Sequence, residues 1–134
     1  MTPLVFHHIG YATDDIDRTA GIFEQMGYGR ETVYTDPVQN TYICFLTKAG
    51  APSIELVAPV DQTSSVNKIL KARGVTPYHL CYETPDIDQS FEEMMEDGFI
   101  PLFRPVEATA FNNRRICYFF KKEIGYLELA ESES

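Results

Sequence analysis

The sequence lacks tryptophan altogether and has only three cysteines among its 134 residues. The three, Cys44, Cys81 and Cys117, are odd in number and far apart, and no C-x-x-C pair occurs. This pattern favours small buried thiols in a reducing compartment over bridged or reactive ones.

Long apolar runs and basic residues are also scarce. No run of about 18 apolar residues is present, so no membrane span is predicted. The first residues show no basic stretch followed by an apolar one, so we expect no signal peptide and a cytoplasmic protein. Eleven Lys and Arg against 20 Asp and Glu give a net charge of −9. Because such a surface repels phosphate backbones and anionic lipids, we expect neither nucleic acid nor membrane as a partner.

What the sequence does contain is an internal repeat. Residues 8–27 align without a gap with residues 79–98, at an offset of 71. The identical pairs are His8/His79, Tyr11/Tyr82, Thr13/Thr84, Asp15/Asp86, Ile16/Ile87, Asp17/Asp88 and Gly27/Gly98. Because the offset is about half the chain, the repeat indicates a duplication and not a solenoid.

Each half predicts the same order of elements, β-α-β-β-β. The expected strands are 5–12, 29–34, 41–47, 53–58, 76–83, 99–106, 114–121 and 125–130, and the expected helices are 15–26, 66–72 and 87–97. We therefore predict one α+β domain spanning residues 1–134. It consists of two tandem βαβββ modules, residues 4–59 and 75–131, joined by a linker helix within residues 60–74. The two sheets are expected to join into a curved cup whose concave face takes a small molecule.

The alternation of side chains along the strands selects four polar residues. The neighbours of His8 in its strand, such as Ile9, point to the face opposite that of His8. His79 has the equivalent position in the second half. Glu55 and Glu128 each lie between two apolar residues of a final strand, at an offset of 73. All four are expected to face the cavity, whereas His7 points to the other face and is interpreted as structural.

Two histidines and two glutamates facing one concavity predict a metal site. Two neutral nitrogens and two carboxylates suit one divalent ion, Zn, Ni, Co, Fe or Mn, whose charge balances the carboxylates. Arg114 and Arg115, which open a strand after the expected loop 107–113, are candidates for binding a substrate carboxylate or phosphate.

Four segments in order resemble the vicinal oxygen chelate superfamily, and within it the branch of glyoxalase I and methylmalonyl-CoA epimerase. They are His8-Ile9-Gly10, Ile54-Glu55-Leu56-Val57-Ala58-Pro59, Pro77-Tyr78-His79-Leu80-Cys81-Tyr82-Glu83 and Gly125-Tyr126-Leu127-Glu128-Leu129. The resemblance implies paired βαβββ modules around a divalent metal, with ligands at the same four positions. It further implies a glyoxalase-like lyase or isomerase that removes a proton next to a carbonyl, with a metal-stabilised enediolate or enolate. Glu128 is the implied base, and members are often homodimers.

Two departures from the family pattern bear on the substrate. Val38 stands where methylmalonyl-CoA epimerases commonly place a catalytic glutamate, although Asp36 is close by. The usual Asp-Pro-Asp-Gly turn of glyoxalase I is Lys122-Glu123-Ile124-Gly125 here. Two other functions remain open on this fold, a metal-dependent dioxygenase and a non-catalytic protein that binds a small molecule. The fourth ligand, Glu55, argues against the dioxygenase, because that chemistry uses two histidines and one carboxylate.

Overall fold

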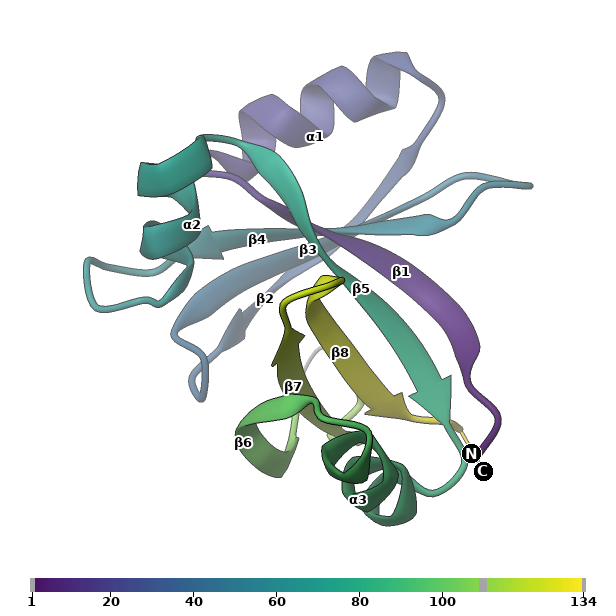
Figure 1. Cartoon of the computed structure of the whole chain (residues 1–134). Helices are drawn as coiled ribbons and strands as arrows, with labels where there is room; N and C mark the ends of the chain where they lie inside the picture. Colours follow the sequence, from purple (N-terminus) through teal and green to yellow (C-terminus); the bar gives the residue numbers. More distant parts are fainter. Residues whose placement is uncertain (1, 109–110, 134) are drawn as a thin grey trace. The chain divides into compact units, whose positions relative to one another are not determined.

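The computed structural model describes residues 2–108 and 111–133, so Ala110 of the expected loop lies outside the described residues. The order β-α-β-β-β occurs once before and once after a short helix (Figure 1). The elements are β1 Val5–Ala12, α1 Ile16–Gln25, β2 Gly29–Asp36, β3 Thr41–Thr47, β4 Ser53–Pro59, α2 Val66–Arg73, β5 Thr76–Thr84, α3 Ile87–Glu96, β6 Ile100–Glu107, β7 Arg115–Lys121 and β8 Gly125–Glu131. The predicted α+β class with two βαβββ modules is confirmed. No helix in the described part of the chain has the length and apolar character needed to cross a membrane.

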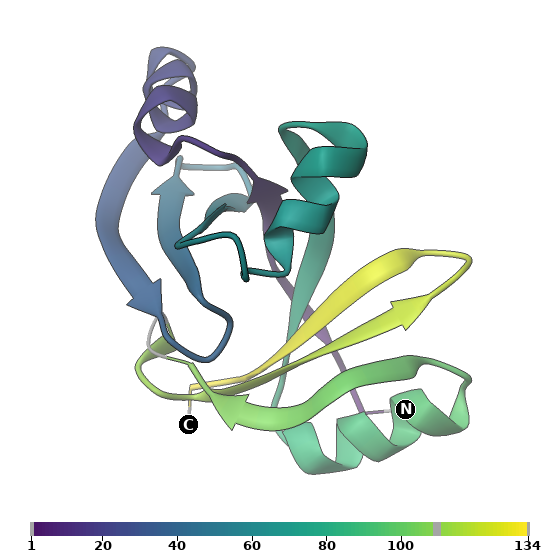
Figure 2. The same ribbon diagram turned by 90° about the vertical axis from the view of Figure 1, so that its left-hand side faces the viewer.

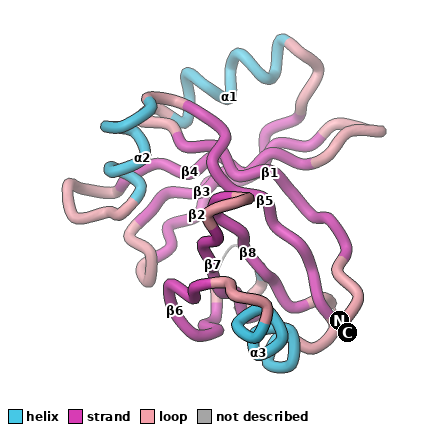
Figure 3. The backbone as a smooth tube through the Cα atoms, in the orientation of Figure 1, coloured by secondary structure: helices cyan, strands magenta, loops and turns pink. Residues whose placement is uncertain are grey.

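The chain forms two compact units, and the first comprises residues 8–78. Its strands are ordered β2-β3-β4-β1, with β1 parallel to β4 and the other neighbours antiparallel. One face of β3 and β4 packs against α1, and the buried cluster there is Ala20, Cys44, Leu46, Ile54 and Leu56. The opposite faces of the same strands carry Ile43, Phe45 and Val57 together with the buried carboxylate of Glu55. Figure 3 separates these strands, in magenta, from the helices, in cyan.

The second unit comprises the residues up to His7 and those from His79 onward. Its strands are ordered β5-β8-β7-β6, with β5 parallel to β8. Helix α3 runs alongside β6 (Figure 2) and covers one face of the sheet. The buried cluster beneath it is Ile87, Phe91, Met94, Cys117, Phe119, Leu127 and Leu129.

The same contacts fix the start of the long helix in both units. Asp15 caps α1 by accepting from the backbone N–H of Arg18 at 3.0 Å, and Asp86 caps α3 by accepting from Gln89 at 3.1 Å. A hydroxyl pair ties each strand end to its helix, at 2.7 Å between Thr13 and Thr19 and at 2.6 Å in the second unit. Side-chain oxygens at N-cap positions satisfy N–H groups that the helix leaves unbonded.

The ends of the two helices are also fixed alike. Gly27 and Gly98 follow α1 and α3 with φ of 97° and 91°, a backbone conformation that other residues rarely adopt. Lys48 donates to the carbonyl of Met26 at 2.8 Å, and Lys121 donates to that of Asp97 at 3.2 Å. The duplication is therefore preserved in the contacts that aim each helix, and not only in the sequence.

Replacing a cap tests this account of the helix starts. We expect Asp15→Ala and Asp86→Ala each to lower the free energy of unfolding by about 1 kcal/mol, because an N–H of the first turn loses its acceptor. Urea unfolding followed by circular dichroism measures the loss. Asp14→Ala, at an exposed neighbour that does not cap, is the matched control. An equal loss in this control would contradict the assignment of Asp15 as the cap.

Candidate metal centre

In the unit of residues 8–78, a histidine and a glutamate on neighbouring strands meet. Glu55 of β4 lies opposite Gly10 of β1, two residues beyond His8 on the same face of the strand. His8 Nε2 lies 3.4 Å from Glu55 Oε1, and their side chains are 0% and 2% exposed. Phe45 of β3, opposite Glu55, sets its ring at 80° to that of His8 with centroids 5.3 Å apart. The unit therefore contains a buried imidazole–carboxylate contact flanked by an aromatic ring.

The other unit contains the same arrangement at the repeated positions. Glu128 of β8 lies opposite Cys81 of β5, two residues beyond His79. His79 Nε2 lies 3.1 Å from Glu128 Oε1, and both side chains are almost fully buried. Tyr118 of β7, opposite Glu128, sets its ring at 85° to that of His79 with centroids 5.2 Å apart. The structure thus brings together, within each unit, the histidine and glutamate that the sequence selected.

Burial makes each pair energetically demanding. A carboxylate removed from water is destabilising unless hydrogen bonds or positive charge compensate for its lost hydration. The surroundings of Glu128 show the effect on a neighbouring group. Burial, reinforced by the negative charge of Glu128, raises the pKa of the Cys117 thiol to about 12. A protonated histidine or a bound cation would offset this local negative charge.

The geometry within each pair fits two ligands of one metal ion. Donor atoms that each lie about 2.0–2.2 Å from an ion are about 3 Å apart when their bonds are near right angles. The observed separations of 3.4 Å for His8–Glu55 and 3.1 Å for His79–Glu128 are close to this value. One imidazole nitrogen and one carboxylate oxygen also suit Zn, Ni, Co, Fe or Mn. Each pair therefore fits a divalent ion, and the sharing of one ion by both pairs stays a prediction.

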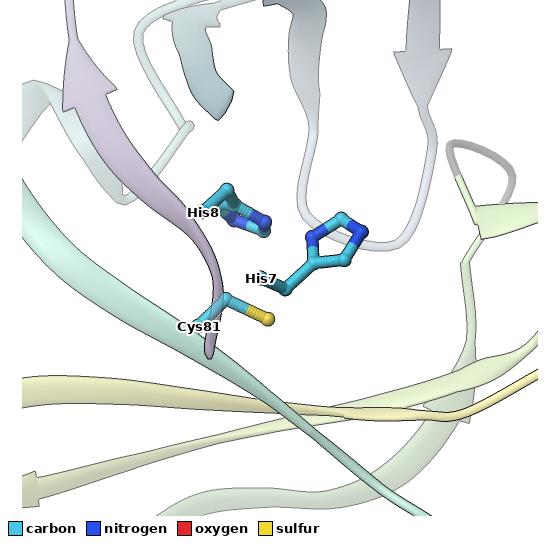
Figure 4. Close-up of side chains that lie close together, drawn as sticks. All are labelled: His7, His8 and Cys81. Atoms are coloured by element: carbon cyan, nitrogen blue, oxygen red, sulfur yellow. The ribbon is translucent and has the colours of Figure 1, made fainter. Parts of the chain in front are cut away.

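His7 and the three cysteines are not members of the two histidine–glutamate contacts. The His7 ring is half-buried and packs at 5.3 Å and 49° against Phe111. One of its ring nitrogens lies within 4.8 Å of the sulfur of the buried Cys81, and Figure 4 labels both side chains. Cys44, Cys81 and Cys117 are all buried in the described part of the chain, as predicted, and none of them forms a disulfide.

The two arginines proposed for substrate binding are held by carboxylates of their own unit. Arg115 forms ion pairs at 2.9 Å with Asp88 and at 3.0 Å with Glu131. These two carboxylates raise the pKa of Arg115, whose guanidinium in turn lowers the pKa of each of them. Arg114 donates to Glu83 at 3.1 Å and to the backbone carbonyl of Glu131 at 2.6 Å. Binding of a substrate anion by either arginine stays a prediction and would have to compete with these contacts.

In the turn that contains Val38, the carboxylate of Asp36 has a structural role. Asp36 is buried, and its Oδ1 accepts from the backbone N–H groups of Val38 at 2.9 Å and Gln39 at 3.2 Å. Its Oδ2 accepts from the Gln39 side chain at 2.9 Å. Both carboxylate oxygens are therefore used in forming the turn.

Sequence reasoning missed the two aromatic neighbours, Phe45 and Tyr118. The signal was available, because they are 73 residues apart, the offset that separates Glu55 from Glu128. Each directly follows a cysteine, Cys44 or Cys117, and these two are also 73 residues apart, but neither aromatic side chain suggests a ligand by itself.

Comparison with known proteins gives the class. Residues 7–118 match the glyoxalase/bleomycin resistance protein/dioxygenase superfamily. The match spans most of the chain, so the protein belongs to this family, and the resemblance drawn from its sequence motifs is confirmed. No protein of curated function matches the chain in sequence.

Solved structures agree on the fold. A methylmalonyl-CoA epimerase from Mycobacterium tuberculosis superposes with a TM-score of 0.86 at 24% identity, covering 97% of this chain and 89% of that one. A hypothetical protein from Bacillus halodurans gives 0.86 at 21% identity, covering 98% and 96%. The Streptomyces coelicolor epimerase, in complex with 2-nitronate-propionyl-CoA, gives 0.85 at 23% identity, covering 98% and 100%. At such identities the likeness shows the fold of the chain.

Thiol chemistry tests the burial around the two pairs. We expect the folded protein at pH 8 to react with a disulfide reagent such as dithionitrobenzoate far more slowly than the unfolded chain. The thiols are buried, and the raised pKa of Cys117 keeps it protonated at that pH. After unfolding in guanidinium, all three cysteines should react. Rapid release of one equivalent from the folded protein would show that a thiol is accessible and contradict the packing.

Proposed function

We propose that the protein is a divalent-metal-dependent isomerase or lyase that moves a proton on the carbon next to a carbonyl group. The observation that carries the proposal is the repeated buried contact, His8 with Glu55 and His79 with Glu128. Membership of the glyoxalase/bleomycin resistance protein/dioxygenase superfamily supports it. The proposed partner is a small molecule, and the proposed assembly is a homodimer.

The four residues His8, Glu55, His79 and Glu128 would hold one ion. Together they offer two neutral nitrogens and two carboxylates, so a divalent cation leaves the group near neutrality. When bound, the ion would supply Lewis-acid stabilisation of the charge that develops on the carbonyl oxygen.

Glu128 is the proposed base. Its carboxylate takes the proton from the carbon next to the carbonyl, and the electrons of the broken C–H bond pass toward the carbonyl oxygen. The carboxyl group formed on Glu128 then returns the proton to carbon, either to the neighbouring carbon of an enediolate or to the opposite face of the same carbon after the planar enolate turns. A carboxylate fixed beside the substrate is suited to this role as a general base.

For the substrate we propose a carbonyl compound with a second oxygen nearby, with 2-methylacyl-CoA esters as the first class to test. Several solved structures of similar fold are named as methylmalonyl-CoA epimerases, which supports this order. The turn at Val38 argues for proton transfer by Glu128 alone, because both oxygens of Asp36 accept hydrogen bonds within that turn.

A proton-exchange assay tests the proposal. We expect protein loaded with Co²⁺, Ni²⁺ or Zn²⁺ to incorporate deuterium from heavy water into a 2-methylacyl-CoA ester, a hemithioacetal or a 2-hydroxy ketone. Mass spectrometry or NMR detects the incorporation. Glu128→Gln should slow the exchange by about 100-fold or more, because general-base catalysis contributes about 10²–10⁴-fold. The matched control is Glu123→Gln, at a largely exposed glutamate of the turn before β8.

The other outcomes of this assay identify the competing functions. Absence of exchange with all three substrate classes, in protein shown to contain the metal, would reject the proposal. Oxygen uptake by Fe²⁺-loaded protein with a catechol would indicate a dioxygenase. Tight binding of a compound that is recovered unchanged and undeuterated would indicate a binding protein.

A further inference from the structure

Phe45 and Tyr118 hold equivalent positions in the two units, one beside each buried histidine–glutamate pair. Phe45 and Tyr118 each lie directly opposite a buried glutamate, and each sets its ring nearly perpendicular to the neighbouring histidine. The centroid distances are 5.3 and 5.2 Å, and both side chains are more than nine-tenths buried. The two aromatic residues therefore differ mainly in the phenol hydroxyl, which only Tyr118 carries.

The ring of Tyr118 is held in a defined orientation. It contacts His79 and also Phe103, whose ring lies 5.7 Å away at 72°. Because the two contacts hold the ring, its hydroxyl is fixed with little loss of conformational freedom on binding a ligand.

The hydroxyl extends past the carboxylate beside it. Tyr118 and Glu128 are opposite each other on antiparallel strands, so their side chains leave the sheet on the same face and side by side. A phenol reaches further from its backbone than a glutamate carboxylate does. Its hydroxyl is therefore suited to a group bound beside Glu128.

We propose that the Tyr118 hydroxyl donates a hydrogen bond to a substrate oxygen beside Glu128, which makes this half of the duplicated site the one where the proton is removed. The inference rests on the proposed function and deepens it. An oxygen that gains negative charge as the proton leaves binds a fixed O–H donor more strongly than the neutral carbonyl does. Phe45 offers no such donor beside Glu55, so the chain itself distinguishes the two glutamates.

Tyr118→Phe tests the proposal, because it keeps the ring contacts and recreates the side chain of the other half. We expect kcat for deuterium exchange to fall about 10- to 100-fold while KM changes little, since the hydrogen bond is strongest as charge develops. We also expect the affinity of Co²⁺-loaded protein for acetohydroxamate, a small anionic chelator, to fall at least about fivefold by calorimetry. The content of bound metal and the melting temperature should match those of the unchanged protein.

Tyr82→Phe is the matched control. Tyr82 packs against the cluster beneath α3, on the other face of β5 from His79, so its hydroxyl should not influence catalysis or chelator binding. Unchanged kcat and unchanged acetohydroxamate affinity in Tyr118→Phe would overturn the inference. Equal losses in both variants, or a loss of activity that tracks a lost metal or a lower melting temperature, would also overturn it, because the hydroxyl would then act through packing.

The two proposals fail in different ways. If the metal-loaded unchanged protein exchanges no proton with any substrate, the proposed function fails. The acetohydroxamate comparison between Tyr118→Phe and Tyr82→Phe still decides whether the hydroxyl donates to a bound anion.

Discussion

The structure depends on the burial of a carboxylate beside an imidazole, once in each unit. His8 with Glu55 and His79 with Glu128 lie on neighbouring parallel strands and are almost fully buried. A chain built only for stability would place apolar residues at these positions, because desolvated charges rarely repay their lost hydration. Their presence in both halves supports a role in binding, and a divalent ion would supply the compensation, because nitrogen and carboxylate donors suit it.

The duplication supplies both the rigidity and the chemistry of this arrangement. Each long helix starts at an aspartate cap and ends at a glycine and a lysine contact, so both sheets are covered in the same way. Because the two halves share these contacts, a side chain that differs between them indicates a difference in their chemistry. Tyr118 carries a phenol at the position where Phe45 carries a phenyl ring. This difference gives two chemically identical glutamates different surroundings.

The repeat made most of the elements predictable, because cap residues, glycine stops and strand alternation recur at a fixed offset. Long-range contacts could not be predicted: Arg115 binds Asp88, which precedes it by 27 residues, and nothing local indicates that pairing. Strand alternation places Leu80 on the face opposite His79, where a core position is expected, but Leu80 is 42% exposed because α3 covers chiefly β6, β7 and β8. Strand β6 contains Pro101 and Pro105 and runs from Ile100 to Glu107 with register shifts. As an edge strand it tolerates the missing N–H donors of the prolines.

The proposed sharing of one ion by ligands from both halves can be tested by a Co²⁺ titration of metal-free protein. Visible absorption and calorimetry should give one ion per chain, and His8→Ala and His79→Ala should each weaken binding by 100-fold or more. The control His7→Ala, which alters the histidine packed against Phe111, should retain one tightly bound ion. Two independent ions per chain, or undiminished binding in either His8→Ala or His79→Ala, would contradict the account.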